Sequence, residues 1–132
     1  MNDTVLVRYI VTDVDAALDF YTTQLGFSVV MHPAPRFAML ARGALRLALS
    51  APGGPGGGGQ AMPDGRMPEP GGWNRISLPV DDLAADVERL RTAGARFRND
   101  IVTGIGGQQV LLDDPSGNPV ELFQSAPPPA TG

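Results

Sequence analysis

The stretch Val5-Leu-Val-Arg-Tyr-Ile-Val11, followed by Asp13 and a helical spacing of apolar residues, decides the fold of this chain. Residues 5–11 are apolar and β-branched enough to predict a strand, and Asp13 stands where a helix N-cap belongs. Apolar side chains then recur on one helical face, at Val14, Leu18, Tyr21 and Leu25. Gly26 predicts the end of this helix, because glycine readily adopts the left-handed conformation.

The same pattern occurs a second time, at an offset of 69 residues from the first capping aspartate, Asp13, to the second, Asp82. A second strand pattern, Ile76-Ser-Leu-Pro-Val80, precedes Asp82, and Pro79 within it predicts an edge position or a strand end. Apolar residues follow at the same helical spacing before a glycine: Leu83, Val87, Leu90 and Gly94. The chain therefore contains two copies of one structural unit.

Three short strand candidates follow each predicted helix. They cover residues 27–31, 36–41 and 44–49 in the first half, and residues 96–102, 108–113 and 119–123 in the second. The segment Asp114-Pro-Ser-Gly117 has the residues of a type I turn, so the last two strands are predicted to form a hairpin. The sequence thus predicts an α+β fold made of two βαβββ modules.

A segment rich in glycine and proline separates the two modules. Residues 51–72 contain 14 of the 30 glycines and prolines of the chain. Such a segment loses much backbone entropy when it becomes ordered, so we expect a connector that is mobile without ligand and a candidate lid. The predicted organisation is one structural domain with a first module at 1–50, the connector at 51–72, a second module at 73–126 and a frayed tail at 127–132.

Composition excludes several classes of function. The chain has 132 residues, a net charge of −4, one histidine and no cysteine, and all ten of its basic residues are arginine. Without lysine it cannot form a Walker-type phosphate loop or a Schiff base, and without cysteine it has no thiolate ligand or nucleophile. No basic stripe predicts nucleic-acid binding. No leader or membrane-spanning segment is evident, so we expect a cytoplasmic protein with no membrane partner.

Three stretches carry a family resemblance: Asp13-Val-Asp-Ala-Ala-Leu-Asp-Phe-Tyr21, Leu25-Gly-Phe27 and Asp114-Pro-Ser-Gly-Asn-Pro-Val-Glu-Leu-Phe123. In this order, after a strand, they resemble the vicinal oxygen chelate superfamily, which includes glyoxalase I, bleomycin-resistance proteins and extradiol dioxygenases. The resemblance implies that the modules close into a cup-shaped mixed sheet with the ligand inside. It also implies a homodimer, because chains with two such modules commonly pair.

The resemblance further implies four positions at which metal-binding members hold their ion, at the first and fourth strands of each module. Counting seven residues back from each capping aspartate, and aligning the two final hairpins by their turn glycines, places four residues there: Leu6, Arg75, Leu47 and Glu121. Only Glu121 has a ligand atom that suits a cation. We therefore expect no metal and no other cofactor, and a divalent ion held loosely by Glu121 is the disfavoured alternative.

The candidate binding residues are Arg75, Glu121, Trp73, Leu6 and Leu47. Arg75 and Glu121 are expected to lie side by side, either as a ligand-facing pair or as a structural salt bridge. Trp73 is a candidate ligand contact at the mouth of the second module, and the two leucines are expected to line the cup. His32 is the only histidine, but no carboxylate stands near it in the sequence, so a structural or exposed role is favoured over that of a general base.

These residues favour a metal-independent protein that binds an aromatic or amphipathic small molecule and sequesters a drug or a toxic metabolite. Arg75 is then the polar anchor. The alternative is a lyase, an isomerase or another enzyme of the superfamily that uses Glu121 as acid/base or as a partial metal ligand. A third interpretation is that the cup is vestigial and that the protein serves as an interaction partner.

Overall fold

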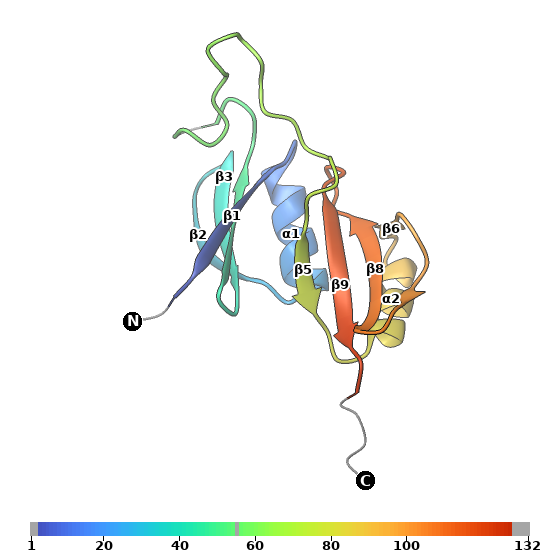
Figure 1. Cartoon of the computed structure of the whole chain (residues 1–132). Coiled ribbons are helices and arrows are strands. Elements are labelled where there is room, and N and C mark those ends of the chain that lie inside the picture. Colours follow the sequence, from blue (N-terminus) through green and yellow to red (C-terminus); the bar gives the residue numbers. More distant parts are fainter. Residues whose placement is uncertain (1–2, 55, 128–132) are drawn as a thin grey trace. The chain divides into compact units, whose positions relative to one another are not determined.

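The computed structural model describes residues 3–54 and 56–127, and the chain is shown in Figure 1. Of the expected tail, residues 128–132 lie outside the described range. None of the described helices is long and apolar enough to cross a membrane. The order of helices and strands follows the two predicted βαβββ units, one after the other.

The first module forms a four-stranded sheet with one helix. Its elements are β1 (Val5–Ile10), α1 (Val14–Gln24), β2 (Ser28–Ala34), β3 (Phe37–Arg42) and β4 (Leu45–Ser50). The strand order is β1-β4-β3-β2, with β1 parallel to β4 and the other pairs antiparallel. The side chain of Asp13 caps α1 by accepting the backbone N–H of Ala16 at 3.0 Å, as the sequence predicts. Gly26 follows the helix with a φ of 75°.

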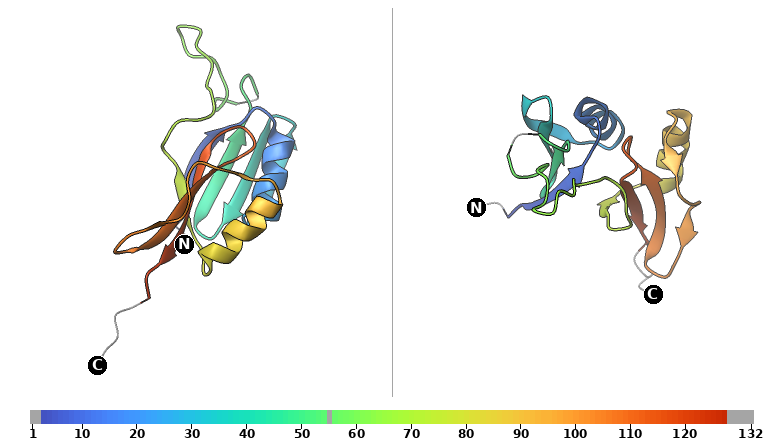
Figure 2. Two further views of the ribbon diagram at one scale, coloured as in Figure 1. Left: turned by 90° about the vertical axis from the view of Figure 1, so that its right-hand side faces the viewer. Right: turned by 90° about the horizontal axis from the view of Figure 1, so that it is seen from above.

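Helix α1 lies along one face of this sheet and covers it (Figure 2). The helix buries Val14, Ala17 and Tyr21. Four fully buried side chains of β3 and β4 point to the same face: Ala38, Leu40, Leu47 and Leu49. Because side chains alternate along a strand, the neighbours of these residues point to the face opposite α1. We call that face the open face of the first sheet; it carries Leu6, Arg8, Phe37, Met39, Ala48 and Ser50.

The second module repeats this arrangement with its own sheet. Its elements are β5 (Ile76–Pro79), α2 (Leu83–Thr92), β6 (Arg96–Phe97), β7 (Val102–Thr103), β8 (Gly107–Asp113) and β9 (Pro119–Ser125). The strand order is β5-β9-β8-β6, and β7 also pairs with β8. Pro79 therefore lies on an edge strand, as predicted. Asp82 caps α2 through the backbone N–H of Ala85, at 3.1 Å.

The predicted strand over residues 96–102 is interrupted, and two short strands, β6 and β7, take its place. The interruption has a local cause. The side-chain oxygen of Asn99 accepts the backbone N–H of Leu111 at 2.8 Å. A side chain thus replaces a backbone carbonyl in the ladder, since asparagine competes well for backbone partners.

By its internal contacts the chain divides into two compact units, which we describe separately. The first contains the chain up to Gly72 together with Asp114–Asn118, and the second contains Trp73–Asp113 and the chain from Pro119 onwards. The connector at 51–72 therefore groups with the first module. So does the loop of the last hairpin.

The first part of the connector packs tightly, and its glycines make this packing possible. Gly54 and Gly59 are buried, and the Gly53 N–H donates to the Gly59 carbonyl at 2.6 Å. A Cβ on Gly59 would overlap the carbonyl oxygen of Ala51, and one on Gly54 would lie 2.8 Å from the Cβ of Arg36. Because glycine has no side chain, these residues allow the backbone to approach neighbouring atoms closely, and they also give the chain more conformational freedom. The expected mobility of the connector remains a prediction.

The loop Asp114–Asn118 is held to α1 and β1 by buried polar contacts. The Gly117 N–H donates to the Asp114 carbonyl at 3.0 Å, which confirms the predicted turn. The Asp114 carboxylate is buried and accepts the hydroxyl of Tyr21 at 2.9 Å. The side-chain amide of Asn118 donates to the carbonyl oxygen of Ile10 at 2.7 Å. This network gives the loop one position within the first unit.

Tyr21→Phe is expected to change how stability depends on pH. Burial, and then the nearby Asp114 carboxylate, raise the pKa of the Tyr21 hydroxyl well above 10.0. Above pH 10 the unfolded chain loses this proton while the folded chain keeps it. Each further pH unit therefore lowers the free energy of unfolding by about 1.4 kcal/mol, until the folded pKa is reached. Urea unfolding of both proteins at pH 8, 10 and 11 measures this contribution, and parallel pH profiles would contradict it.

Candidate ligand-binding site

The candidate site lies on the open face of the second sheet. Buried residues of β5 and β9, namely Ile76, Leu78, Val120 and Leu122, point to the face covered by α2. Their neighbours along each strand point the other way. The strand register places Ser77 opposite Glu121 on this open face. Arg75 comes two residues before Ser77 and so points to the same side.

Arg75 and Glu121 form an ion pair on this face, which confirms the contact predicted from the sequence. Nη2 of Arg75 lies 3.0 Å from Oε1 of Glu121, and Nε donates to the same oxygen at 3.3 Å. The second carboxylate oxygen, Oε2, accepts the hydroxyl of Ser77 at 2.6 Å. The exposed fraction is 29% for the Arg75 side chain and 14% for Glu121. Both carboxylate oxygens are therefore engaged, and the guanidinium is held in one orientation.

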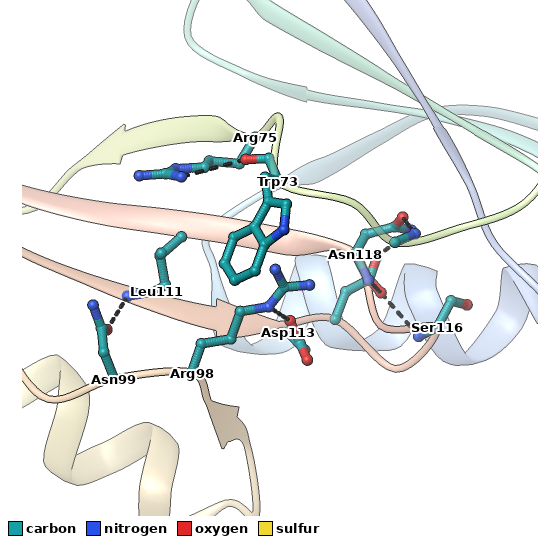
Figure 3. Close-up of polar contacts among 10 residues, drawn as sticks. Trp73, Arg75, Arg98, Asn99, Leu111, Asp113, Ser116 and Asn118 are labelled. Carbon is teal, nitrogen blue, oxygen red and sulfur yellow. Dashed lines mark hydrogen bonds and ion pairs between the residues drawn. The ribbon is translucent and has the colours of Figure 1, made fainter.

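Trp73 adds an aromatic surface beside this pair (Figure 3). Its backbone carbonyl accepts Nη1 of Arg75 at 3.3 Å, and its side chain is 69% exposed. The guanidinium of Arg98 stacks on the indole, with Cζ 4.7 Å from the ring centroid. Nε of Arg98 in turn donates to Asp113 at 2.6 Å. Arg98 thus holds the indole from one side by a cation–π contact.

Sequence reasoning missed Arg98, Asp113 and Ser77. The signal for Ser77 was present, because it lies two residues after Arg75 and alternation along a strand puts both on one face. Asp113 could not be placed from the sequence, because its position on the face of Glu121 follows from the pairing of Asp113 with Pro119. Arg98 could not be placed either, since it belongs to the interruption between β6 and β7 and reaches Trp73 only through the folded sheet.

The structure corrects the placement of Leu47. This side chain is fully buried on the face covered by α1, whereas Leu6 is 53% exposed on the open face. The hairpin alignment failed because two residues separate the paired Arg42 and Leu45, but five separate Asp113 and Pro119. A shift of one residue turns a side chain to the other face of a sheet. The β4 residues that share the face of Leu6 are Arg46, Ala48 and Ser50, and Ala48 pairs with Arg8 as Glu121 pairs with Ser77.

His32 has an acidic neighbour that the sequence did not suggest. Its Nε2 lies 3.8 Å from Oδ1 of Asp15, which helix α1 brings close. The Asp15 side chain is 81% exposed and the His32 side chain 32%. Both groups therefore lie at the surface of the first unit, as the favoured interpretation of His32 expects.

The residues at the four implied metal positions do not fit a metal ion. Leu6 and Leu47 have no ligand atom, Arg75 is cationic, and both oxygens of Glu121 are already engaged. Across the described ranges, 3–54 and 56–127, no group of three or more histidine and acidic side chains could hold a metal ion.

Two βαβββ modules, each with a helix on one sheet face and the other face left open, define the glyoxalase/bleomycin-resistance fold. The sequence model of the Glyoxalase/Bleomycin resistance protein/Dioxygenase superfamily matches residues 4–122. The chain belongs to this superfamily. No match to a curated protein was found.

Solved structures of the same fold resemble the chain over nearly its whole length. TnmS3 from Streptomyces sp. CB03234, an antibiotic binding protein, is 25% identical, with 96% of this chain and 98% of TnmS3 covered and a TM-score of 0.71. A superfamily member from Sphaerobacter thermophilus DSM 20745 is 28% identical. The match covers 95% of this chain and 98% of that protein, with a TM-score of 0.74. Lactoylglutathione lyase from Agrobacterium tumefaciens is 21% identical, covers 91% of both chains with a TM-score of 0.69, and shows the fold alone.

Proposed function

We propose that this protein binds a small aromatic or amphipathic molecule without a metal ion, and sequesters it. The observation that carries the proposal is the Arg75–Glu121 ion pair, which stands where the family resemblance implies metal ligands. The similarity to an antibiotic binding protein, TnmS3, supports a binding role. The proposal keeps two expectations from the sequence, a homodimer and a cytoplasmic location.

Arg75 supplies the polar anchor. A guanidinium has five N–H groups in a rigid plane. Three of them donate within the described residues, two to Glu121 and one to the carbonyl of Trp73. The other two are available for a carbonyl oxygen of the ligand. Because Glu121 balances the charge of Arg75, a neutral carbonyl suits this anchor.

Trp73 supplies the apolar contact. Arg98 stacks on its indole and Asp113 holds Arg98, so the exposed ring keeps its position before a ligand arrives. A ligand ring that stacks on this indole loses little additional side-chain entropy. An aromatic ring bearing a carbonyl group therefore matches Trp73 and Arg75 together.

The enzymatic alternative, with Glu121 as acid/base, has weaker support. Ser77 and Arg75 occupy both oxygens of the Glu121 carboxylate. A proton acceptor has to offer an oxygen lone pair to the substrate within hydrogen-bonding distance. In this arrangement Glu121 positions Arg75.

The proposed function is tested with 2-acetonaphthone, a neutral aromatic ketone, as the probe. Trp73 is the only tryptophan of the chain, so its fluorescence reports on this site alone. We expect 2-acetonaphthone to quench this fluorescence to a saturating level. We also expect calorimetry to give a stoichiometry near one 2-acetonaphthone molecule per chain. Quenching that stays linear with concentration, as collisions produce, would overturn the proposal.

We predict that the purified protein carries no stoichiometric transition metal. Of the residues aligned with the four implied ligand positions, Leu6 and Arg75 offer no anionic or neutral donor atom, and Leu47 offers none and also points to the face covered by α1. Elemental analysis after purification without chelators measures the transition-metal content per chain. One tightly held Zn, Ni, Fe or Mn per chain would contradict the metal-independent proposal and favour the enzyme.

A further inference from the structure

A pocket lies within the first unit, between the connector and the open face of the first sheet. This pocket is a shallow depression, open to solvent, with a volume of about 340 Å³, and it is lined by Arg8, Pro33, Phe37 and residues 56–58, which are all glycine. Such a volume is near the lower end of small-molecule sites, which measure about 300–1,000 Å³. The walls are mainly apolar side chains and backbone, and Arg8 is the single charged group among the lining residues.

Arg8 differs from the arginines of the candidate site in its charge balance. Arg75 pairs with Glu121, and Arg98 pairs with Asp113. Arg8 instead donates from Nη1 to the neutral hydroxyl of Ser50 at 2.9 Å. In the part of the chain that the structure describes, no carboxylate lies within ion-pair distance of Arg8. Its positive charge therefore remains available to an anion.

The connector and Ser50 together position the Arg8 guanidinium. A Cβ on Gly58 would overlap Nη1 of Arg8 and would lie 2.9 Å from Oγ of Ser50. Gly58 therefore leaves the space that the guanidinium occupies. At Gly57, by contrast, an added Cβ would meet nothing within 4 Å. The two neighbouring glycines thus give a matched pair for substitution.

We propose that this pocket binds a small aromatic carboxylate. Arg8 pairs with the carboxylate, because a guanidinium presents parallel N–H groups that match its two oxygens. Phe37 and Pro33 contact the ring. The ligand class differs from that of the candidate site in the second module, where the arginine is already neutralised. The inference therefore goes beyond the proposed function and does not depend on it.

The test uses 2-naphthoate as the probe and 2-naphthamide, which has the same shape without the charge, as its comparison. Binding is followed by calorimetry and by the NMR signals of the backbone amides of Phe37 and Gly58. We expect saturable shifts of these signals and an affinity at least tenfold higher for 2-naphthoate than for 2-naphthamide. Equal affinities, or shifts confined to the second module, would overturn the proposal.

Arg8→Met keeps the apolar stem and removes the charge. We expect it to weaken 2-naphthoate binding at least tenfold and to leave 2-naphthamide unaffected. The control is Arg46→Met, because Arg46 lies on the same sheet face but donates to backbone oxygens of the β3–β4 turn. An equal loss in both variants, or no loss in Arg8→Met, would overturn the role of Arg8.

Gly58→Ala displaces the guanidinium without removing it. We expect a severalfold loss of 2-naphthoate affinity in Gly58→Ala and less than a twofold change in Gly57→Ala. Thermal unfolding shows whether both variants fold, and if Gly58→Ala does not, Arg8→Met decides the question. Arg89→Ala, which removes a surface ion pair on α2 of the second unit, is expected to leave 2-naphthoate binding intact, and an equal loss in this variant would overturn the role of the pocket.

Discussion

Asp114→Ala lowers the free energy of unfolding by roughly 3–4 kcal/mol, because it leaves several buried hydrogen-bond donors without an acceptor. The Asp114 carboxylate accepts the Tyr21 hydroxyl at 2.9 Å and the side-chain amide of Asn118 at 3.1 Å. It also accepts the backbone N–H groups of Ser116 and Asn118, at 2.8 and 2.9 Å. Asp114 is 3% exposed and Tyr21 is fully buried, so water cannot readily replace the carboxylate.

Urea denaturation at pH 7 measures this effect. Asp100→Ala is the control, because the Asp100 side chain is 95% exposed and its ion pair with Arg91 lies at the surface. The control is expected to unfold at nearly the wild-type urea concentration. A loss of less than about 1 kcal/mol in Asp114→Ala would mean that the loop finds other partners.

Arg75→Ala weakens binding of 2-acetonaphthone by roughly 2–5 kcal/mol, because truncation removes the polar anchor and leaves the Glu121 carboxylate without its cation. The side chain of Glu121 is 14% exposed, so it is poorly placed to recover solvation. Folding is expected to survive in part, since the pair lies on the open face and the core of the second unit lies on the other face.

The titration follows Trp73 fluorescence in the wild type, Arg75→Ala and Glu121→Gln. Arg89→Ala is the matched control, because Arg89 belongs to α2 and pairs with Asp86 one helical turn away. Unchanged stability and affinity in both Arg75→Ala and Glu121→Gln would show that the candidate site is misplaced. A loss in Arg89→Ala of the same size would point to a general effect on folding.

The broad fold was predictable because its signals are local. Asp13 and Asp82 cap their helices through N–H groups three residues away, and Gly26 and Gly94 follow the helix ends with positive φ values. Such contacts depend on nearby residues and on a helical period that can be read along the chain. The Arg75–Glu121 contact was also predictable, because the resemblance to the vicinal oxygen chelate superfamily implies that both positions face the cup.

Contacts between distant residues needed the tertiary structure. Leu47 was assigned to the wrong face because hairpin loops of different length shift the strand register, and a shift of one residue reverses the face. The stacking of Arg98 on Trp73 follows from an interruption that the Asn99 side chain makes in a predicted strand. Neither the register of the hairpin strands nor the interruption of the predicted strand 96–102 has a periodic signature in the sequence.

The sequence by itself determined the two βαβββ modules, their helix caps and the last turn, because each depends on short-range spacing and on backbone preference. Apart from Arg75 and Glu121, only the tertiary structure decided which distant side chains meet. It joined Tyr21 to Asp114, and it packed Gly54 against Arg36 and Gly58 against Arg8 and Ser50. It also left Arg8 without a carboxylate among the described residues. These pairings depend on strand register and close packing, which emerge only when residues far apart in the chain come together.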